Sequence, residues 1–289
     1  MEFKRATKTQ SRLRAALFGP SGAGKTFSAL RIASGLGGAI AVIDTERGSA
    51  SKYASHFSFD VLDLPKAHRD IDGYCAAIDA AAQAGYQVLV IDSLTHAWQE
   101  LLSEVERLAS AKYRGNTWSA WSEGTPKQRQ LIDAILDFPG HVLATMRSKT
   151  EWTTETTSGG KSAPKRVGLA PEQGKGIEYE FDVLIELSTD HVASIIKDRT
   201  GKFQDATITK PGEDFGQQLA AWLLDGAPDV EAAKARIKAT VGGATWKDVT
   251  TWLEDPNYAM PKTAEDWLTL DKWIITRTAE RSKVANAAA

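Results

Sequence analysis

Short apolar runs alternate with stretches of helical periodicity over the first 225 residues. The runs that we interpret as strands cover residues 13–18, 39–43, 61–64, 88–91 and 142–146. The stretches that we interpret as helices cover residues 25–36, 70–84, 96–108 and 126–136. Continuous apolar strands with helices between them are typical of a parallel sheet that helices cover on both faces. We therefore predict an α/β fold with a mostly parallel sheet.

The pattern changes after the fifth strand. Residues 152–176 are rich in Thr, Ser, Gly, Lys and Pro and show no periodicity, so we predict a long loop, which inside a compact domain is usually functional or disordered. Apolar runs at residues 181–187 and 192–196 flank a short Ser-Thr-Asp-His turn and predict an antiparallel pair that extends the sheet. A helix over residues 216–224 is expected to follow.

Residues 226–228, Gly-Ala-Pro, form a candidate domain boundary, because only helical patterns follow them. Thr245 with Asp248, and Thr263 with Asp266, have the spacing of caps at helix N-termini. We therefore predict an α/β domain with a basic N-terminal arm over residues 1–225, and a small helical domain over residues 226–289.

Composition narrows the classes of function. The 289 residues include 35 Lys and Arg and 37 Asp and Glu, a net charge of -2, so any nucleic-acid binding must come from a local patch. The single cysteine excludes a disulfide framework and a multi-cysteine zinc site. The apolar runs are too short for a membrane span, and the first residues lack the apolar core of a secretory signal. We expect a soluble cytoplasmic protein with no membrane partner.

The clearest motif is Gly-Pro-Ser-Gly-Ala-Gly-Lys-Thr at residues 19–26. It fits the P-loop pattern G-x-x-x-x-G-K-[ST] and lies between a predicted strand and a predicted helix, which is the context that the motif needs. Its N–H groups can surround phosphate oxygens, Lys25 can contact the β- and γ-phosphates, and the Thr26 hydroxyl can bind magnesium. The competing interpretation is a glycine-rich turn that matches by chance. We predict that ATP contacts Gly19, Pro20, Ser21, Gly22, Ala23, Gly24, Lys25, Thr26 and Phe27.

Acidic residues follow two of the apolar strands. Asp92 ends the strand over residues 88–91, where a Walker B aspartate would orient the water shell of magnesium, or it caps the next helix. We therefore predict a magnesium site at Thr26 and Asp92. The strand over residues 39–43 is followed by Asp44-Thr45-Glu46, and a carboxylate at this edge can activate a water that attacks the γ-phosphate. Spacing alone allows Asp44 or Glu46 in this role, or a solvated loop charge.

Two groups of cations are further candidates. Lys197 and Arg199 follow a strand and can project to the same side, where they reach a neighbour's γ-phosphate in an assembled ATPase or form a charged turn. The segment from Arg147 to Lys175 contains six basic and three acidic residues. Such a loop suits single-stranded nucleic acid or is a solvated surface loop. Its predicted contacts with nucleic acid are Trp152, Lys161, Lys165 and Arg166, and the N-terminal arm adds Lys4, Arg5, Lys8, Arg12 and Arg14.

Four motifs together resemble the RecA/RadA recombinase core, which hexameric DnaB-type helicases share. They are the P-loop, Ile-Asp-Thr-Glu at residues 43–46, Val-Ile-Asp-Ser at residues 90–93 and Lys-x-Arg-x-Gly at residues 197–201. The resemblance is closest to compact RecA-core ATPases of bacteriophages, which include proteins linked to single-strand annealing recombination. It implies that Glu46 is the catalytic base, that Asp92 is the Walker B acid and that Lys197 and Arg199 act in trans. It also implies a DNA-binding loop over residues 152–175.

Two features depart from the recombinase pattern. Recombinases carry a glutamine that senses the γ-phosphate at the end of the strand before the DNA-binding loop, whereas this strand ends in Ala144-Thr145-Met146-Arg147. The N-terminal polymerisation helix of the recombinases is not evident in the sequence.

The resemblance implies a magnesium-dependent, DNA-stimulated ATPase that acts on single-stranded DNA in phage-type recombination or annealing, in the bacterial host cytoplasm if a phage encodes it. It also implies self-association into a ring or filament, with a single-strand-binding or replisome protein as a further candidate partner. The alternative is an ATP-gated binding protein, such as a helicase loader or assembly switch, with weak turnover. A small-molecule P-loop kinase is less favoured, because the sequence lacks an arginine-rich lid motif and leaves Lys-x-Arg-x-Gly unexplained.

Overall fold

The centre of the protein is a nine-stranded sheet, within the part of the chain that the structure describes. The structure is a computed structural model that describes residues 8, 10–156, 162–226, 229–243 and 245–287, with the backbone alone for residues 152–156, 162–167 and 279–287. The strands are β1 (Arg14–Gly19), β2 (Ile40–Asp44), β3 (Asp60–Asp63), β4 (Val88–Asp92), β5 (His141–Thr156), β6 (Ser162–Pro171), β7 (Val183–Leu187), β8 (Val192–Asp198) and β9 (Thr207–Thr209).

The strand order is β3-β2-β4-β5-β1-β7-β8-β9, with β6 paired to β5 outside this path. The pairs from β3 to β7 are parallel, and β7, β8 and β9 pair antiparallel. Strands β1, β2 and β4 are buried along their whole length, as expected for central parallel strands with both faces covered. The predicted mostly parallel α/β fold is therefore confirmed, and so is the antiparallel pair at residues 183–198.

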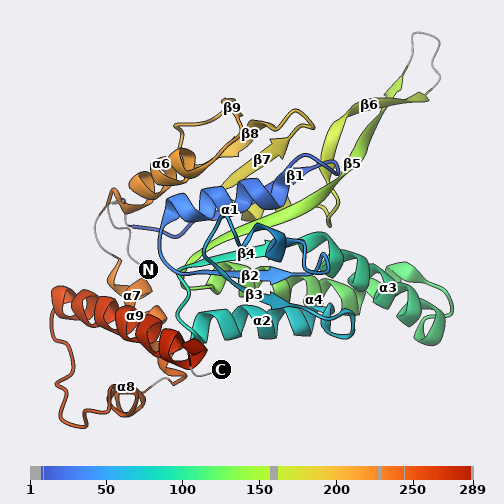
Figure 1. Cartoon of the computed structure of the whole chain (residues 1–289). Coiled ribbons are helices and arrows are strands. Elements are labelled where there is room, and N and C mark those ends of the chain that lie inside the picture. Colours follow the sequence, from blue (N-terminus) through green and yellow to red (C-terminus); the bar gives the residue numbers. More distant parts are fainter. Residues whose placement is uncertain (1–7, 9, 157–161, 227–228, 244, 288–289) are drawn as a thin grey trace, which may run out of the picture.

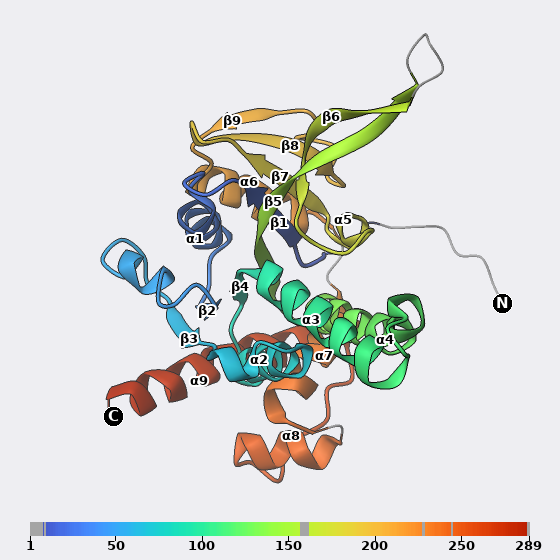
Figure 2. The ribbon, with the colours of Figure 1, turned by 90° about the vertical axis from the view of Figure 1, so that its right-hand side faces the viewer.

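Helices cover both faces of the sheet (Figures 1 and 2). Helices α1 and α6 pack on one face, where Leu30, Ile32 and Leu219 belong to one apolar cluster. Helices α2, α3 and α4 pack on the other face, where Tyr74 and Leu101 belong to a second cluster. The helices of the α/β part are α1 (Lys25–Leu36), α2 (Ile71–Gln83), α3 (Leu94–Lys112), α4 (Thr117–Asp137), α5 (Ile177–Glu180) and α6 (Glu213–Leu224).

Helix α4 begins nine residues before the predicted start at Pro126. Asn116 caps the helix by accepting from the Ser119 N–H at 3.1 Å. Pro126 lies inside this helix of 21 residues and removes a single backbone donor. Trp121, on the part of α4 before the proline, packs on Trp98 with ring centroids 5.6 Å apart. Tertiary packing therefore outweighs the helix-start preference of proline at this position.

The prediction of a loop over residues 152–176 is wrong for most of its length. Strand β5 continues to Thr156 and pairs antiparallel with β6, from Ser148↔Pro171 to Thr156↔Ser162, and the two strands extend away from the sheet as a ribbon (Figure 1). We refer to this strand pair, residues 148–156 of β5 and 162–171 of β6, as the ribbon. Strands that pair only with each other need no buried face, so the ribbon lacks the apolar alternation by which strands are recognised.

Three helices end the chain, namely α7 (Val230–Val241), α8 (Trp246–Leu253) and α9 (Ala264–Ala287). They bury a cluster of their own around Ile237, Leu253 and Leu270, and Arg236 on α7 is ion-paired with buried Asp271 on α9. Both predicted caps are confirmed, since Thr245 and Asp248 form a capping box and Thr263 Oγ1 accepts from the Asp266 N–H at 3.1 Å. No helix of the described residues is both long and apolar enough to span a membrane.

The basic N-terminal arm is partly used for internal contacts. Lys8 Nζ is 3.0 Å from Asp225 Oδ2. Arg14 lies in β1, is 7% exposed, and donates to the carbonyl oxygens of Leu136, Phe138 and Gly140. The expectation that Arg14 contributes to a DNA-binding surface is therefore wrong, because its guanidinium supports the connection between α4 and β5. Residues 4 and 5 lie outside the described residues.

Candidate nucleotide site

The segment 19–26 forms a loop between the end of β1 and the start of α1, at the carboxyl edge of the parallel strands. Gly22 and Gly24 both have a φ of +81°, a left-handed conformation that residues with a Cβ rarely adopt. A Cβ on Gly24 would also lie 3.1 Å from His191 Nδ1. The loop therefore depends on glycine at these two positions, as a phosphate-binding loop does.

The ammonium group of Lys25 folds back onto this loop. Its Nζ donates to the carbonyl oxygens of Gly19 and Pro20, both at 2.9 Å. Burial lowers the pKa of Lys25, whereas the charges of Asp92 and Glu46 oppose this shift. A partly desolvated cation on the glycine-rich loop before a helix N-terminus is suited to phosphate oxygens.

Thr26 and Asp92 are in direct contact. Thr26 Oγ1 donates to Asp92 Oδ2 at 2.6 Å, and Thr145 Oγ1 donates to Asp92 Oδ1 at 2.5 Å. Asp92 is 2% exposed, and burial raises its pKa, against the effect of these two hydrogen bonds. Asp92 does not cap α3, because Ser93 occupies the N-cap position.

The Thr26 hydroxyl and the Asp92 carboxylate are oxygen ligands of the kind that Mg²⁺ binds together with phosphate oxygens and water. Among the described residues, no group of three or more His, Cys, Asp and Glu side chains could hold a metal by itself. A magnesium ion would therefore be bound here by Thr26, Asp92 and the phosphates of a nucleotide, and it would neutralise charge on those phosphates.

Asp44 and Glu46 have different surroundings although they are two residues apart. The Asp44 carboxylate is 1% exposed and accepts from the backbone N–H groups of Glu46, at 2.6 Å, and Ala50, at 2.9 Å. Asp44 thus shapes the turn after β2. The Glu46 side chain lines the same cavity as Lys25 and Asp92. Of the two acids, Glu46 is the one with a carboxylate that a bound nucleotide can reach.

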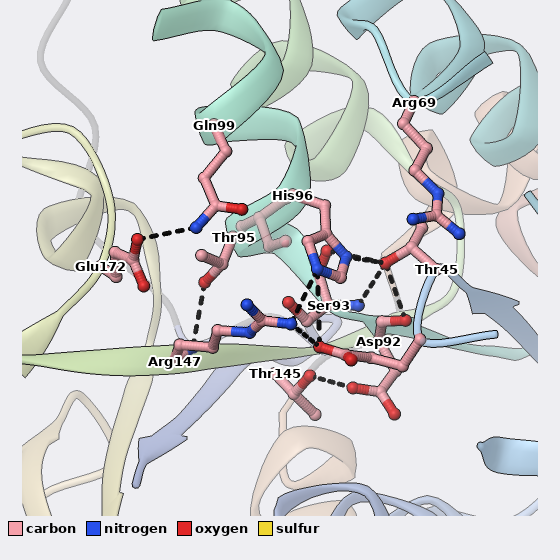
Figure 3. Close-up of polar contacts among 12 residues, drawn as sticks. Thr45, Arg69, Asp92, Ser93, Thr95, His96, Gln99, Thr145, Arg147 and Glu172 are labelled. Atoms are coloured by element: carbon pink, nitrogen blue, oxygen red, sulfur yellow. Dashed lines mark hydrogen bonds and ion pairs between the residues drawn. The ribbon is translucent and has the colours of Figure 1, made fainter. Parts of the chain in front are cut away.

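A polar network connects this site with the end of the buried part of β5 (Figure 3). Arg147 Nη2 donates to Glu46 Oε1 at 2.8 Å and lies 2.9 Å from His96 Nε2, and His96 Nδ1 lies 2.7 Å from Thr45 Oγ1. Because an arginine only donates, His96 Nε2 is the acceptor and His96 Nδ1 carries the proton that is donated to Thr45. Burial lowers the pKa of His96, Glu46 opposes this shift and Arg147 adds to it, which agrees with a neutral ring.

The P-loop opens into a cavity of about 1030 Å³. Its lining includes every residue predicted to contact ATP except Ala23, whose side chain is buried in the core. Phe27 lines the cavity and packs against Tyr53, with ring centroids 5.4 Å apart. Lining residues that sequence reasoning missed include Arg31, Tyr53, Arg147, His191 and Lys210.

Two of these missed residues carry a usable signal in the sequence. Arg147 ends an apolar strand, as Asp44 and Asp92 do, and the carboxyl ends of parallel strands meet at one edge of a sheet. His191 lies in the turn between β7 and β8, and its Nδ1 is 3.2 Å from the carbonyl oxygen of Ala23. The sequence predicts that turn, but its position beside the P-loop follows only from the pairing of β7 with β1.

Lys197 and Arg199 lie at the amino ends of the neighbouring parallel strands, whereas the P-loop of their own chain lies at the carboxyl ends. Strand β7 is parallel to β1, and β8 returns antiparallel, so that Asp198 is paired with Val183 at the amino end of β7. Both cations donate to the carbonyl oxygen of Tyr179, Lys197 Nζ at 2.9 Å and Arg199 Nη2 at 2.7 Å. They share one side, as predicted, and neither lines the cavity at Lys25.

The residues predicted to contact nucleic acid lie on the ribbon or outside the described residues. Trp152 is paired with Arg166, and Thr153 with Lys165, next to an irregularity in the pairing after Glu151. Lys161 lies outside the described residues, and for the other three the structure describes the backbone.

A family model described as an AAA domain matches residues 11–213. The chain belongs to this family. The AAA domain match runs from the residues before β1 to the first residue of α6, so it includes the P-loop, Asp92 and the whole sheet. The protein is therefore a P-loop ATPase.

Two further comparisons add little to the AAA domain assignment. Among curated proteins, no sequence matches the chain. Among solved structures, the chain is similar to a prototypical ATPase from the type III secretion system of pathogenic bacteria, with 14% sequence identity and a TM-score of 0.35. That match covers 91% of this chain and 80% of the other.

Proposed function

We propose that the protein hydrolyses ATP with magnesium and acts on single-stranded DNA, in recombination or annealing of the phage type. The observation that supports hydrolysis is the convergence of Lys25, the Thr26–Asp92 pair and Glu46 on one cavity. These are a phosphate-binding cation, a pair of magnesium ligands and a carboxylate at the edge of the sheet where the P-loop begins.

Each residue has a role that its position allows. The N–H groups of the P-loop and Lys25 hold the phosphates, and Glu46 accepts a proton from the water that attacks the γ-phosphate. Thr26 and Asp92 hold the magnesium ion. Asp44 keeps Glu46 in place through the turn that its carboxylate stabilises.

Lys197 and Arg199 are proposed to act on the nucleotide of a neighbouring subunit. Their place at the far edge of the sheet from Lys25 supports this role, because a finger in trans must be out of reach of its own P-loop. A ring or filament of subunits is required for it.

The ribbon is proposed to be the DNA-binding element, through Trp152, Lys161, Lys165 and Arg166. Its extension away from the body of the protein supports this role, since a strand pair without helices on its faces leaves both faces open to a ligand (Figure 2). Phosphates would be bound by the cations and bases would stack on the tryptophan.

An ATPase assay with magnesium, carried out with and without single-stranded DNA, tests the proposal. We expect measurable turnover that single strands increase and that duplex DNA increases less. Turnover that DNA leaves unchanged would contradict the DNA-binding role but not the ATPase. ATP binding without turnover, together with a stable stoichiometric protein complex, would favour the alternative of a helicase loader or assembly switch.

A further inference from the structure

A second cavity, of about 270 Å³, lies at the amino edge of the parallel strands. Its lining includes His141, the first residue of β5, and Arg12, two residues before β1, together with Arg236 on α7 and Ile275 on α9. Helices α7 and α9 lie at the end of the protein away from the ribbon (Figure 1). The cavity shares no lining residue with the nucleotide cavity at the carboxyl edge, so it is a separate hollow between the α/β part and the C-terminal helices.

Arg12 is a cation in this cavity without a partner. Its side chain is half-buried and forms no hydrogen bond or ion pair with any residue that the structure describes. Burial, and then the charge of Arg236, lower the pKa of Arg12 to about 10, against the opposing charges of Asp271 and Asp229. The group is therefore still charged at neutral pH. A charge that leaves water without gaining a partner costs stability, and such a conflict is expected mainly at functional sites, where a ligand can supply the partner.

The acidic residues near Arg12 already have partners of their own. Arg236 donates to both carboxylate oxygens of Asp271 through Nε, at 3.2 and 3.1 Å, and to one of them also through Nη2. Asp229 caps α7, where its carboxylate accepts from the Ala232 N–H at 3.0 Å. Nη1 of Arg236 makes no hydrogen bond within the described part of the chain. Arg12 and this nitrogen are therefore left as donors for a ligand.

His141 adds a neutral donor. It is 8% exposed, and its Nδ1 accepts from the Leu13 N–H at 3.0 Å, so the ring hydrogen is on Nε2. Burial, and then the charges of Arg12, Arg14 and Arg236, lower the pKa of His141 to about 3. The ring is therefore neutral at physiological pH, and the three cations around it favour an anion beside its N–H.

The remaining wall of the cavity is largely apolar and includes Leu36, Pro139, Leu224 and Ile275. Sites for small molecules commonly combine such walls with a few converging polar groups, and they occur preferentially at domain interfaces. A bare inorganic ion would leave these walls in contact with water. The lining therefore favours an anion that carries an apolar body.

We propose that this cavity binds a small organic anion, a carboxylate or a phosphate monoester on an apolar body, with Arg12, Arg236 and His141 as the donors to its oxygens. A guanidinium matches two oxygens of either group, and hydrogen bonds between charged partners are stronger than those between neutral ones. Arg12 and His141 belong to the α/β part and Arg236 to α7, so the bound anion links the two parts of the chain. This binding depends neither on ATP hydrolysis nor on the ribbon.

The test is isothermal titration calorimetry with benzoate, with phenyl phosphate and, as a neutral analogue, with benzamide, in the presence of excess magnesium and ADP to occupy the P-loop. We expect one or both anions to bind the wild type and benzamide not to bind, and the anion that binds identifies the charged group. Loss of a charge-assisted hydrogen bond should weaken binding about 10- to 100-fold in Arg12→Gln. Arg129→Gln, which removes an exposed arginine on α4 outside the cavity, should bind as the wild type does.

A second variant and thermal unfolding complete the test. Ala220 lines the cavity from α6, and leucine at this position should fill the space of the apolar body and prevent binding while Arg12 stays in place. Without ligand, Arg12→Gln should have a Tm equal to or above that of the wild type, because it removes an unpaired, partly desolvated charge. The anion should raise the Tm of the wild type and of Arg129→Gln, but not that of the two cavity variants.

The anion site would be refuted if neither anion bound the wild type, if benzamide bound as well as the anions, or if Arg12→Gln kept the wild-type affinity. If Arg12→Gln weakened binding of single-stranded DNA while neither anion bound, Arg12 would belong to a nucleic-acid surface instead. If Arg12→Gln does not fold, Ala220→Leu decides by comparison with Arg129→Gln, and unchanged affinity in Ala220→Leu would refute the site.

Discussion

Thr26 and Asp92, 66 residues apart in the sequence, share a hydrogen bond of 2.6 Å between Thr26 Oγ1 and Asp92 Oδ2. The bond joins the first turn of α1 to the end of β4, so the phosphate-binding loop and the proposed magnesium ligand form one unit. Asp92 is almost fully buried, and this burial raises its pKa. Burial therefore makes the ionised form of this carboxyl group less favourable in the folded chain than in the unfolded one.

Replacing Asp92 by asparagine is expected to stabilise the nucleotide-free protein at neutral pH while removing its response to magnesium. A carboxyl group whose pKa is raised on folding binds its proton more tightly in the folded state, so its stabilising effect is present at low pH and is lost as the pH rises through the folded pKa. The asparagine amide carries no charge at any pH. The Tm of Asp92→Asn should therefore exceed that of the wild type at about pH 7.5, and the difference should shrink as the pH falls.

The same experiment has a ligand arm and a control. Magnesium with ATP should raise the Tm of the wild type more than ATP alone, and this extra increase should be absent in Asp92→Asn. Asp63→Asn, at the same end of the exposed edge strand β3, should change neither quantity. A lower Tm for Asp92→Asn at neutral pH, or an intact magnesium effect, would contradict the assignment.

Replacing Glu46 by glutamine is expected to reduce kcat by about 100-fold or more and to leave ATP affinity within a few-fold of the wild type. Glutamine has nearly the same shape, but it cannot accept the proton of the attacking water, and general bases contribute about 10²–10⁴-fold. Single-turnover kinetics and a binding titration measure the two effects separately.

Asp44→Ala provides the contrast for this experiment. It leaves the N–H groups of Glu46 and Ala50 without their acceptor, so we expect a loss of stability, at about 1–3 kcal/mol for each unsatisfied buried group. Denaturant unfolding measures that loss. If Asp44→Ala kept its stability and Glu46→Gln kept its turnover, the roles of the two acids would have to be exchanged.

Mixing two inactive variants is expected to restore ATPase activity. Lys25→Ala should abolish nucleotide binding, and Arg199→Ala should keep binding but lose hydrolysis, because a finger in trans is worth about 10³-fold or more in rate. A mixed assembly contains interfaces that pair an intact P-loop with an intact Arg199. Activity is measured as the two variants are titrated against each other.

The control for this mixture is Lys202→Ala, an exposed cation in the turn after Arg199. Arg199 is itself about half exposed in its ion pair with Asp182, so its truncation should cost about 1 kcal/mol of stability or less. A protein that stays monomeric at all concentrations, with undiminished activity in Arg199→Ala, would refute the trans assignment.

Replacing Lys165 and Arg166 by alanine is expected to weaken binding of single-stranded DNA and to flatten its dependence on salt. Each phosphate contact on a single strand contributes about 0.7 to the slope of log K against log salt concentration, so two lost contacts should lower the slope by about 1.4. The matched control is Lys238→Ala with Lys247→Ala, which removes two cations from the C-terminal helices. Equal slopes for all three proteins would show that the two ribbon cations make no phosphate contacts.

The sheet and the P-loop could be predicted because their signals are local. A continuous apolar run identifies a strand that is buried on both faces, as in β1, β2 and β4, and a motif between a strand and a helix identifies the phosphate loop. The ribbon carries no such signal. Its two strands are stabilised mainly by each other, and hydrogen bonds between two polar strands leave no periodic apolar pattern in the sequence.

The sequence predicts the role of a site residue only where the residue type and its local motif are sufficient to indicate that role. Asp44 and Glu46 look equivalent in sequence, and what separates them is that backbone N–H groups occupy the Asp44 carboxylate. Arg147 is recognisable in the sequence as a strand end, but its contact with Glu46, 101 residues away, depends on the order β2-β4-β5 in the sheet. Such relations between strand ends follow from topology, which a single sequence specifies only weakly.

Strand β5 passes from the core into the ribbon as one uninterrupted strand from His141 to Thr156. The folding of the sheet needs only its first residues, which pair with β1 and β4. The outer part of the ribbon is therefore an exchangeable module. Shortening it, lengthening it or grafting another hairpin beyond Thr150 and Leu169 should leave the ATPase core intact, so the same core could carry a different outer element.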